Sequence, residues 1–162
     1  GVFDFDGVFT DGGIYLDNKS EGFRRFDVKD GLGIKLLQKN DFIIAIISGS
    51  NSQIINERAK ALDIKIVRTG ISSKLETLKE IQDDLNIKVE ETIFLGDDIN
   101  DLTVLSTISL FIVPSVAHIG CKRKAAYISK TKGWKGFIRE VVDNLLISRN
   151  IDPYLPFETK ND

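Results

Sequence analysis

The sequence has very little cysteine, histidine and methionine, and each shortage excludes a class of protein. One Cys among 162 residues leaves no intramolecular disulfide framework, so we expect a reducing compartment and a cytoplasmic location. One His, His118, leaves no His-based metal cluster, and we expect it to lie in a loop. The chain has no Met and begins with Gly1, so we expect a processed form or a domain of a longer protein.

Long apolar runs and a strong net charge are also missing. No run approaches the roughly 20 apolar residues that a membrane-spanning helix needs, and no charged-then-apolar leader opens the chain. The 22 basic and 24 acidic residues leave a formal net charge of −2, which provides no basic surface for nucleic acid. We therefore expect neither a membrane nor a nucleic acid as a partner.

Short apolar runs alternate with helical patterns along the chain. The runs at 2–5, 42–47, 65–67, 92–95 and 110–113 predict strands, and the windows at 31–39, 53–62, 73–85 and 137–146 predict helices. Because the runs are apolar throughout, rather than alternately apolar and polar, they favour parallel strands covered on both faces. The pattern predicts an α/β fold with a Rossmann-like, doubly wound parallel sheet.

Two segments depart from this alternation. Residues 13–28 have the pattern of two short strands around a polar turn at 17–22, which predicts a β-hairpin inserted after the first strand. Residues 150–162 are rich in Pro and polar side chains, which predicts a C-terminal tail. We therefore expect a single domain over residues 1–149.

Two carboxylates follow the first apolar run, in the sequence Asp4-Phe5-Asp6-Gly7. Ligands of open α/β sheets bind beyond the carboxyl ends of the strands, and side chains at i and i+2 of an ideal strand share a face. The spacing therefore predicts that Asp4 and Asp6 face one site, and Gly7 permits a tight turn whose amides would cradle an anion. An acidic loop without chemistry is the alternative for this motif alone.

A second acidic group, Gly96-Asp97-Asp98-Ile99-Asn100-Asp101, follows the apolar run at 92–95. In a parallel sheet, Asp4, Asp6 and Asp97 would converge at the same edge, where mutual repulsion raises carboxylate pKa values. A hard cation such as Mg²⁺, which binds a few carboxylates together with water and substrate phosphate oxygens, relieves that repulsion. A helix start capped by Asp explains one or two of these carboxylates, but not all of them.

Two further positions suit a phosphate ligand. Ser48, with Gly49, follows the run at 42–47 and offers a hydroxyl and backbone amides, although a turn residue or helix cap is the simpler interpretation. Lys74 opens a predicted helix, where the helix dipole disfavours a cation. Neutralisation of a phosphate and of the acidic group would explain a lysine at that position.

Taken in order along the chain, these motifs resemble the haloacid dehalogenase-like hydrolase superfamily. The resemblance rests on Asp4-x-Asp6, Ser48, Lys74 and Gly96-Asp97-x-x-x-Asp101. More narrowly, the segments DFDGVFTDGGIY, FDVKDGLGIKLL and GDDIND are similar to the branch without a cap domain. That branch includes phosphatases of 3-deoxy-D-manno-octulosonate 8-phosphate and of sialic-acid-type nonulosonate 9-phosphates. The same domain occurs fused behind some acylneuraminate cytidylyltransferases.

The resemblance implies a Mg²⁺-dependent phosphatase of a sugar-acid phosphate that works through an aspartyl-phosphate. Asp4 would be the nucleophile, and Asp6 would protonate the leaving alkoxide and then activate water. The carboxylates of Asp4 and Asp97 and the backbone carbonyl of Asp6 would bind Mg²⁺. Asp101 and Asp98 would orient the metal ligands without binding the ion themselves. The pathway implied is cell-surface sugar synthesis, of lipopolysaccharide octulosonate or of a sialic-acid-like sugar.

The resemblance also implies how the substrate is held. Ser48, Gly49 and Lys74 would hold the phosphoryl oxygens. At the position of Ser50 the octulosonate phosphatases typically carry Arg and the nonulosonate phosphatases carry Glu, so this sequence matches neither. Arg58, on the next helix, is a candidate for binding the sugar carboxylate, and a solvated surface charge is an equal alternative.

The resemblance further implies a homotetramer, in which hairpins like 13–28 pack together and neighbouring subunits help to close each active site. An isolated hairpin is marginal in water, although this one has the alternative of folding back on its own domain. Two other functions stay open. One is a non-catalytic oligomerisation domain of a cytidylyltransferase. The other, which fits less well, is a phospho-acceptor signalling domain, because such domains carry the acceptor Asp on a middle strand whereas Asp4 follows the first.

Overall fold

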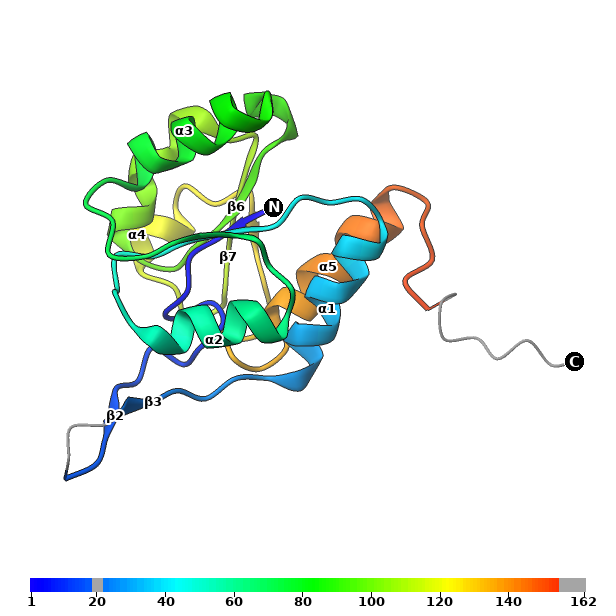
Figure 1. Ribbon diagram of the computed structural model, residues 1–162. Coiled ribbons are helices and arrows are strands. Elements are labelled where there is room, and N and C mark those ends of the chain that lie inside the picture. Colours follow the sequence, from blue (N-terminus) through cyan, green and yellow to red (C-terminus); the bar gives the residue numbers. More distant parts are fainter. Residues whose placement is uncertain (19–21, 155–162) are drawn as a thin grey trace, which may run out of the picture.

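A parallel sheet of six strands forms the centre of the protein (Figure 1). The computed structural model describes residues 1–18 and 22–154. In sheet order the strands are β5 (Ile66–Arg68), β4 (Ala45–Ile47), β1 (Val2–Phe3), β6 (Ile93–Leu95), β7 (Leu110–Val113) and β8 (Tyr127–Ile128). Every neighbouring pair is parallel. The predicted α/β fold with a doubly wound parallel sheet is confirmed.

Helices cover both faces of this sheet. They are α1 (Val28–Lys39), α2 (Gln53–Ala61), α3 (Lys74–Leu85), α4 (Ile119–Lys122) and α5 (Phe137–Ser148), with 3₁₀ helices η1 (Val89–Glu91) and η2 (Ile99–Thr107). One core cluster buries α1, α2 and α5 against the sheet, and α1 and α5 lie side by side in Figure 1. The second cluster buries α3, α4 and η2 against the opposite face. None of the helices in the described ranges combines the length and the apolarity needed to cross a bilayer.

The N-terminal strand is shorter than the apolar run at 2–5 predicts. β1 ends at Phe3, and the backbone N–H groups of Val8 and Phe9 then donate to the Phe5 carbonyl, which forms a helical turn. Four elements, β8, α4, η1 and η2, carry no prediction from the sequence. The first three have only two to four residues, which is too short to show a period. Most other predicted elements agree with the structure to within a few residues at each end.

The predicted hairpin is confirmed as β2 (Tyr15–Leu16) paired antiparallel with β3 (Gly22–Phe23). The rings of Tyr15 and Phe23 stack across the pair with centroids 5.3 Å apart. Half of its predicted turn, at 19–21, lies outside the described residues, as does 155–162 of the predicted tail. The hairpin extends away from the sheet, and Ile14, Leu16 and Phe23 on it are 70%, 63% and 59% exposed (Figure 1).

The strand order determines where a site can form. β4, β1 and β6 are neighbours at the middle of the sheet, so their carboxyl ends lie side by side. Ser48 follows β4, Asp4 follows β1, and Gly96 and Asp97 follow β6. Three motifs that are far apart in the sequence therefore meet at one edge.

Packing between α1 and the core yields a test of the fold. Ile34 is fully buried, whereas Leu32 on the same helix is 37% exposed. Because Ile34→Ala leaves a cavity, we expect it to lower the free energy of unfolding by about 2–5 kcal/mol, and Leu32→Ala to lower it by about 1 kcal/mol or less. Urea denaturation measures both, and equal losses would contradict this packing.

Candidate active site

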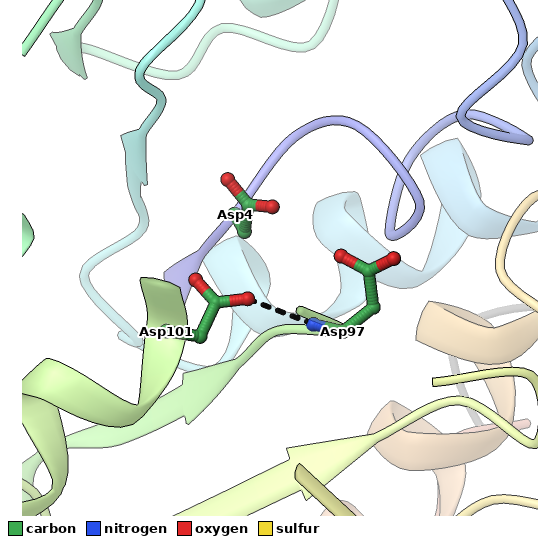
Figure 2. Close-up of side chains that lie close together, drawn as sticks. All are labelled: Asp4, Asp97 and Asp101. Carbon is green, nitrogen blue, oxygen red and sulfur yellow. Dashed lines mark hydrogen bonds between the residues drawn. The ribbon is translucent and has the colours of Figure 1, made fainter. Parts of the chain in front are cut away.

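Three carboxylates gather at the carboxyl edge of the sheet (Figure 2). Asp4, Asp97 and Asp101 each offer an oxygen, and these oxygens lie within 4.8 Å of one another. The backbone N–H of Asp4 donates to the Leu95 carbonyl at 2.9 Å, which fixes Asp4 beside β6. We call these three residues the acidic cluster.

Asp101 holds the loop that carries Asp97. Its buried carboxylate accepts hydrogen bonds from the backbone N–H of Asp97 at 2.9 Å, drawn dashed in Figure 2, and of Asp98 at 3.1 Å. Gly96 leaves room for this arrangement, because a Cβ there would lie 2.5 Å from the Asp101 Cγ. Asp101 is therefore both a member of the acidic cluster and the anchor of the loop after β6.

Lys74 supplies the only ammonium group bonded to the acidic cluster among the described residues. Its Nζ lies 2.7 Å from Asp4 Oδ1 and 2.5 Å from Asp101 Oδ1, and the residue is 5% exposed. These contacts explain why a lysine opens α3 against the helix dipole. One ammonium cannot neutralise three carboxylates, so the buried cluster retains excess negative charge.

That excess charge shows in the pKa values. Burial first, and then the neighbouring Asp4 and Asp101, raise the pKa of Asp97 to about 7. Burial and Asp101 likewise raise the pKa of Asp4 to about 7, against the opposing effect of Lys74. Burial lowers the pKa of Lys74, but the Asp4 and Asp101 carboxylates outweigh it and the net direction is upward.

The donor set of the acidic cluster fits a magnesium ion. No hydrogen bond between described residues ends on the Asp97 carboxylate, although it is half-buried among other acids. Mg²⁺ prefers one or two carboxylates together with water and phosphate oxygens, and Asp4 and Asp97 offer such ligands. A divalent cation would also supply the positive charge that Lys74 alone does not.

Asp6 is placed differently from the sequence prediction. Its carboxylate accepts from Thr10 Oγ1 and from Arg24 Nε, both at 3.3 Å, and it is not a member of the acidic cluster. The assumption that Asp4-x-Asp6 is an extended strand is wrong, because β1 ends at Phe3. That the two carboxylates face one site stays a prediction.

The remaining predicted site residues lie around the cluster. Asp98 is exposed, and its carboxylate accepts from the Ile99 backbone N–H at 2.7 Å, so it caps η2. Ser48 is buried after β4, and its Oγ accepts from the backbone N–H of Ser50 at 3.1 Å. Gly49 lies between them, so these residues form a tight loop next to Asp4.

Arg58 is not a freely solvated charge. Its guanidinium lies 4.8 Å from the centre of the Phe26 ring and donates to the Asp27 carbonyl at 3.2 Å, while its buried Nε has no hydrogen-bond partner among the described residues. Burial lowers the pKa of Arg58. It lines a pocket of about 650 Å³ between the hairpin and α2, together with Arg24.

Two residues near the site were not predicted from the sequence. Arg24 reaches Asp6 from the hairpin across 18 positions, and nothing in its local sequence marks it. Thr10 accepts hydrogen bonds through its hydroxyl from the backbone N–H of Gly7 and Gly12 and donates to Asp6. A polar residue three positions after a tight turn is the only signal that would have indicated Thr10.

The sequence is similar to a known protein family over most of its length. Residues 37–140 match the family described as haloacid dehalogenase-like hydrolase, which is more than half of the chain. The chain belongs to the haloacid dehalogenase-like hydrolase family. The sequence resemblance to this family is therefore confirmed.

Several relatives within the haloacid dehalogenase-like hydrolases are similar over nearly the whole chain. The 3-deoxy-D-manno-octulosonate 8-phosphate phosphatase of Yersinia pestis is 35% identical over 149 residues, which is 92% of this chain and 80% of the relative. A solved structure from Vibrio cholerae, described as a 3-deoxy-D-manno-octulosonate 8-phosphate phosphatase, has a TM-score of 0.90 and 38% identity. The comparison covers 92% of this chain and 83% of that chain.

A third relative was solved with ligands. The 3-deoxy-D-manno-octulosonate 8-phosphate phosphatase of Moraxella catarrhalis, in complex with a magnesium ion, a phosphate ion and a KDO molecule, has a TM-score of 0.91 and 29% identity. The comparison covers 96% of this chain and 90% of that chain. A magnesium ion in this relative agrees with the donor set of the acidic cluster.

The raised pKa of Asp97 predicts how metal binding depends on pH. In the metal-free protein the protonated carboxyl favours the fold at low pH, and this contribution is lost as the pH rises through about 7. Mg²⁺ binds the deprotonated form, so the rise in melting temperature that Mg²⁺ causes should be larger at about pH 8 than at about pH 5.5.

Differential scanning calorimetry with and without Mg²⁺ measures this difference. Asp97→Asn is the control and should show no Mg²⁺-dependent shift at either pH. An equal shift at both pH values in the unchanged protein would contradict a cation held by Asp97.

Proposed function

We propose that this protein is a Mg²⁺-dependent phosphatase that hydrolyses 3-deoxy-D-manno-octulosonate 8-phosphate. One observation carries the proposal: a buried acidic cluster with a single lysine lies at the carboxyl edge of the sheet. The relatives at 35% and 38% identity named for this substrate support the choice of sugar acid. Residues 1–149 would form the phosphatase domain.

In the proposed reaction, the Asp4 carboxylate is the nucleophile. One of its oxygens forms a bond to phosphorus as the bond from phosphorus to the sugar oxygen breaks, and Asp6 gives its proton to that leaving oxygen. Asp6 then takes a proton from water, whose oxygen attacks phosphorus. The bond to Asp4 breaks, inorganic phosphate leaves, and Asp4 is free again.

In this proposal the surrounding residues bind the metal ion and the phosphoryl oxygens. The Asp4 and Asp97 carboxylates and the Asp6 carbonyl would hold Mg²⁺, which when bound offsets the negative charge between the carboxylates and the phosphate. Lys74 would pair with a phosphoryl oxygen from its position 2.7 Å from Asp4. The loop of Ser48 and Gly49 would offer its hydroxyl and amides to the other phosphoryl oxygens.

Substrate choice is proposed to depend on the pocket beside the hairpin. Arg58 lines it and is only partly buried, and its planar guanidinium suits a carboxylate of the substrate. Ser50, which follows Ser48 and Gly49, is uncharged. The octulosonate phosphatases typically carry Arg at that position and the nonulosonate phosphatases carry Glu. A sialic-acid-type nonulosonate 9-phosphate is therefore the comparison substrate in the tests below.

We propose a homotetramer and a cytoplasmic location. The exposed apolar residues Ile14, Leu16 and Phe23 of the hairpin support association, because an apolar surface of this kind is stabilised by a second copy. The single, buried Cys121 supports a reducing compartment.

The first test of the function is phosphate release with Mg²⁺. The octulosonate 8-phosphate should be turned over faster than a nonulosonate 9-phosphate or a hexose phosphate. Asp4→Asn should reduce the rate to less than about one thousandth, because it removes the nucleophile. Asp84→Asn, an exposed acid on α3, is the control and should leave the rate unchanged.

Three outcomes would contradict the proposal in different ways. No turnover by folded, Mg²⁺-bound protein favours the non-catalytic oligomerisation domain. Labelling of the protein without repeated release favours the phospho-acceptor domain. Faster turnover of the nonulosonate would correct the sugar acid alone.

Arg58 can be tested separately from the chemistry. Arg58→Lys keeps the charge but loses the planar fork, so it should raise the KM for the octulosonate phosphate by about tenfold or more. Turnover of p-nitrophenyl phosphate, which has no sugar carboxylate, should change little. Lys60→Ala on the same helix is the control, and an equal loss with both substrates would contradict the assignment.

The oligomeric state can be tested through the hairpin. Light scattering should give the mass of four chains for the unchanged protein and a smaller assembly for Leu16→Asp, which places a charge on the apolar surface. Ile147→Asp, on an exposed position of α5, is the control and should stay tetrameric. A monomeric unchanged protein would contradict the proposal.

A further inference from the structure

A loop far along the chain lies directly against the turn that follows the nucleophile. Gly133, between β8 and α5, is buried, and a Cβ built on it would overlap the carbonyl oxygen of Gly7 and lie 2.8 Å from its carbonyl carbon. The backbone N–H of Trp134 donates to the Val8 carbonyl at 3.3 Å. Two consecutive residues of this loop therefore contact two consecutive residues of the turn.

The same turn is in contact with Asp97 on its other side. Gly7 has φ +83°, and a Cβ on it would overlap the Asp97 carboxylate, with the Oδ1 atom 2.8 Å away. The order of contact is thus Gly133, then Gly7, then the Asp97 carboxylate. Neither glycine leaves space for even one methyl group in this stack.

The reason for glycine differs between these two positions. Gly7 needs both the left-handed backbone and the space, whereas Gly133 is not among the glycines with positive φ. An alanine at 133 would therefore meet no backbone strain, and its cost would come from the contact with Gly7 alone. This difference makes Gly133 the position at which the contact can be changed by itself.

The loop is fixed at both ends. Before Gly133, the Glu140 carboxylate accepts from Ser129 Oγ and Thr131 Oγ1, both at 2.9 Å. After Gly133, the buried Asp30 of α1 accepts from the backbone N–H of Gly136 at 3.3 Å and of Arg139 at 2.9 Å. A segment held in this way cannot move aside without breaking several of these hydrogen bonds.

We propose that Gly133 is a positioning residue that sets the place of the Asp97 carboxylate, and through it the affinity of the acidic cluster for Mg²⁺. The proposal rests on the proposed function, in which Asp97 is a metal ligand. The contact is made with the carbonyl of Gly7, one peptide beyond the Asp6 carbonyl that is assigned as the other ligand of this turn. Pressure from position 133 would therefore act on Gly7 and, through it, on the Asp97 carboxylate.

The test is Mg²⁺ binding measured by calorimetry without substrate. Gly133→Ala should weaken binding by about tenfold or more, the range found when groups that support metal ligands are changed. Its melting temperature without metal should fall, because the added methyl group overlaps backbone atoms of Gly7, and its phosphatase activity should recover as Mg²⁺ is raised. Lys132→Ala, an exposed neighbour in the same loop, is the control and should bind Mg²⁺ normally.

Two further variants keep the result interpretable. Asp97→Asn should abolish the calorimetric signal, which shows that the binding measured is at the acidic cluster. Glu140→Ala, which releases the start of the loop without adding bulk, should also weaken Mg²⁺ binding and is the deciding variant if Gly133→Ala does not fold.

Folded Gly133→Ala with unchanged Mg²⁺ affinity would overturn the proposal, as would Glu140→Ala with unchanged affinity in the case where Gly133→Ala is unfolded. Because binding is measured without substrate, failure of the proposed phosphatase activity would be seen separately, as Mg²⁺ binding without turnover.

Discussion

The structure depends on a shortage of positive charge at one edge of its sheet. Lys74 bonds to Asp4 and Asp101, but Asp97 has no cation of its own in the part of the chain that the structure describes. Burial first, and then the neighbouring carboxylates, raise the pKa values of Asp4 and Asp97 to about 7. A fold that buries three acids around one lysine is stabilised by a divalent cation, and the same cation prepares the site for a phosphate.

The rest of the fold serves to bring these charges together. The order of the sheet makes β4, β1 and β6 neighbours, so three loops meet although they are separated by more than 40 residues each. Helix α3 delivers Lys74 at its first turn, and the 3₁₀ helix η2 delivers Asp101. Two separate apolar cores hold the helices on either face, which keeps the strand ends rigid.

Much of this arrangement could be predicted from the sequence. The apolar runs predicted a parallel sheet, and a parallel sheet was enough to predict that Asp4 and Asp97 meet at one edge. The strand geometry assumed for Asp4-x-Asp6 is wrong because β1 is only two residues long and ends before it reaches them. The resemblance gave Asp101 a supporting role, but its burial and its bond to Lys74 are tertiary properties that the sequence did not show.

Contacts made by residues outside the strand-end motifs could not be predicted. Arg24 meets Asp6 from the end of β3, and Gly133 meets Gly7 from the loop between β8 and α5. Neither residue belongs to a local motif, and a glycine required for space looks the same in sequence as one in a flexible loop. Such contacts are where the structure adds most to the sequence.

Anomalous diffraction from crystals soaked in Mn²⁺ would locate a cation at the acidic cluster. We expect one strong peak bonded to the carboxylates of Asp4 and Asp97 and to the Asp6 carbonyl, with Asp101 still holding the loop. A Mn²⁺ peak elsewhere, or no peak at the acidic cluster at saturating Mn²⁺, would contradict a cation site there.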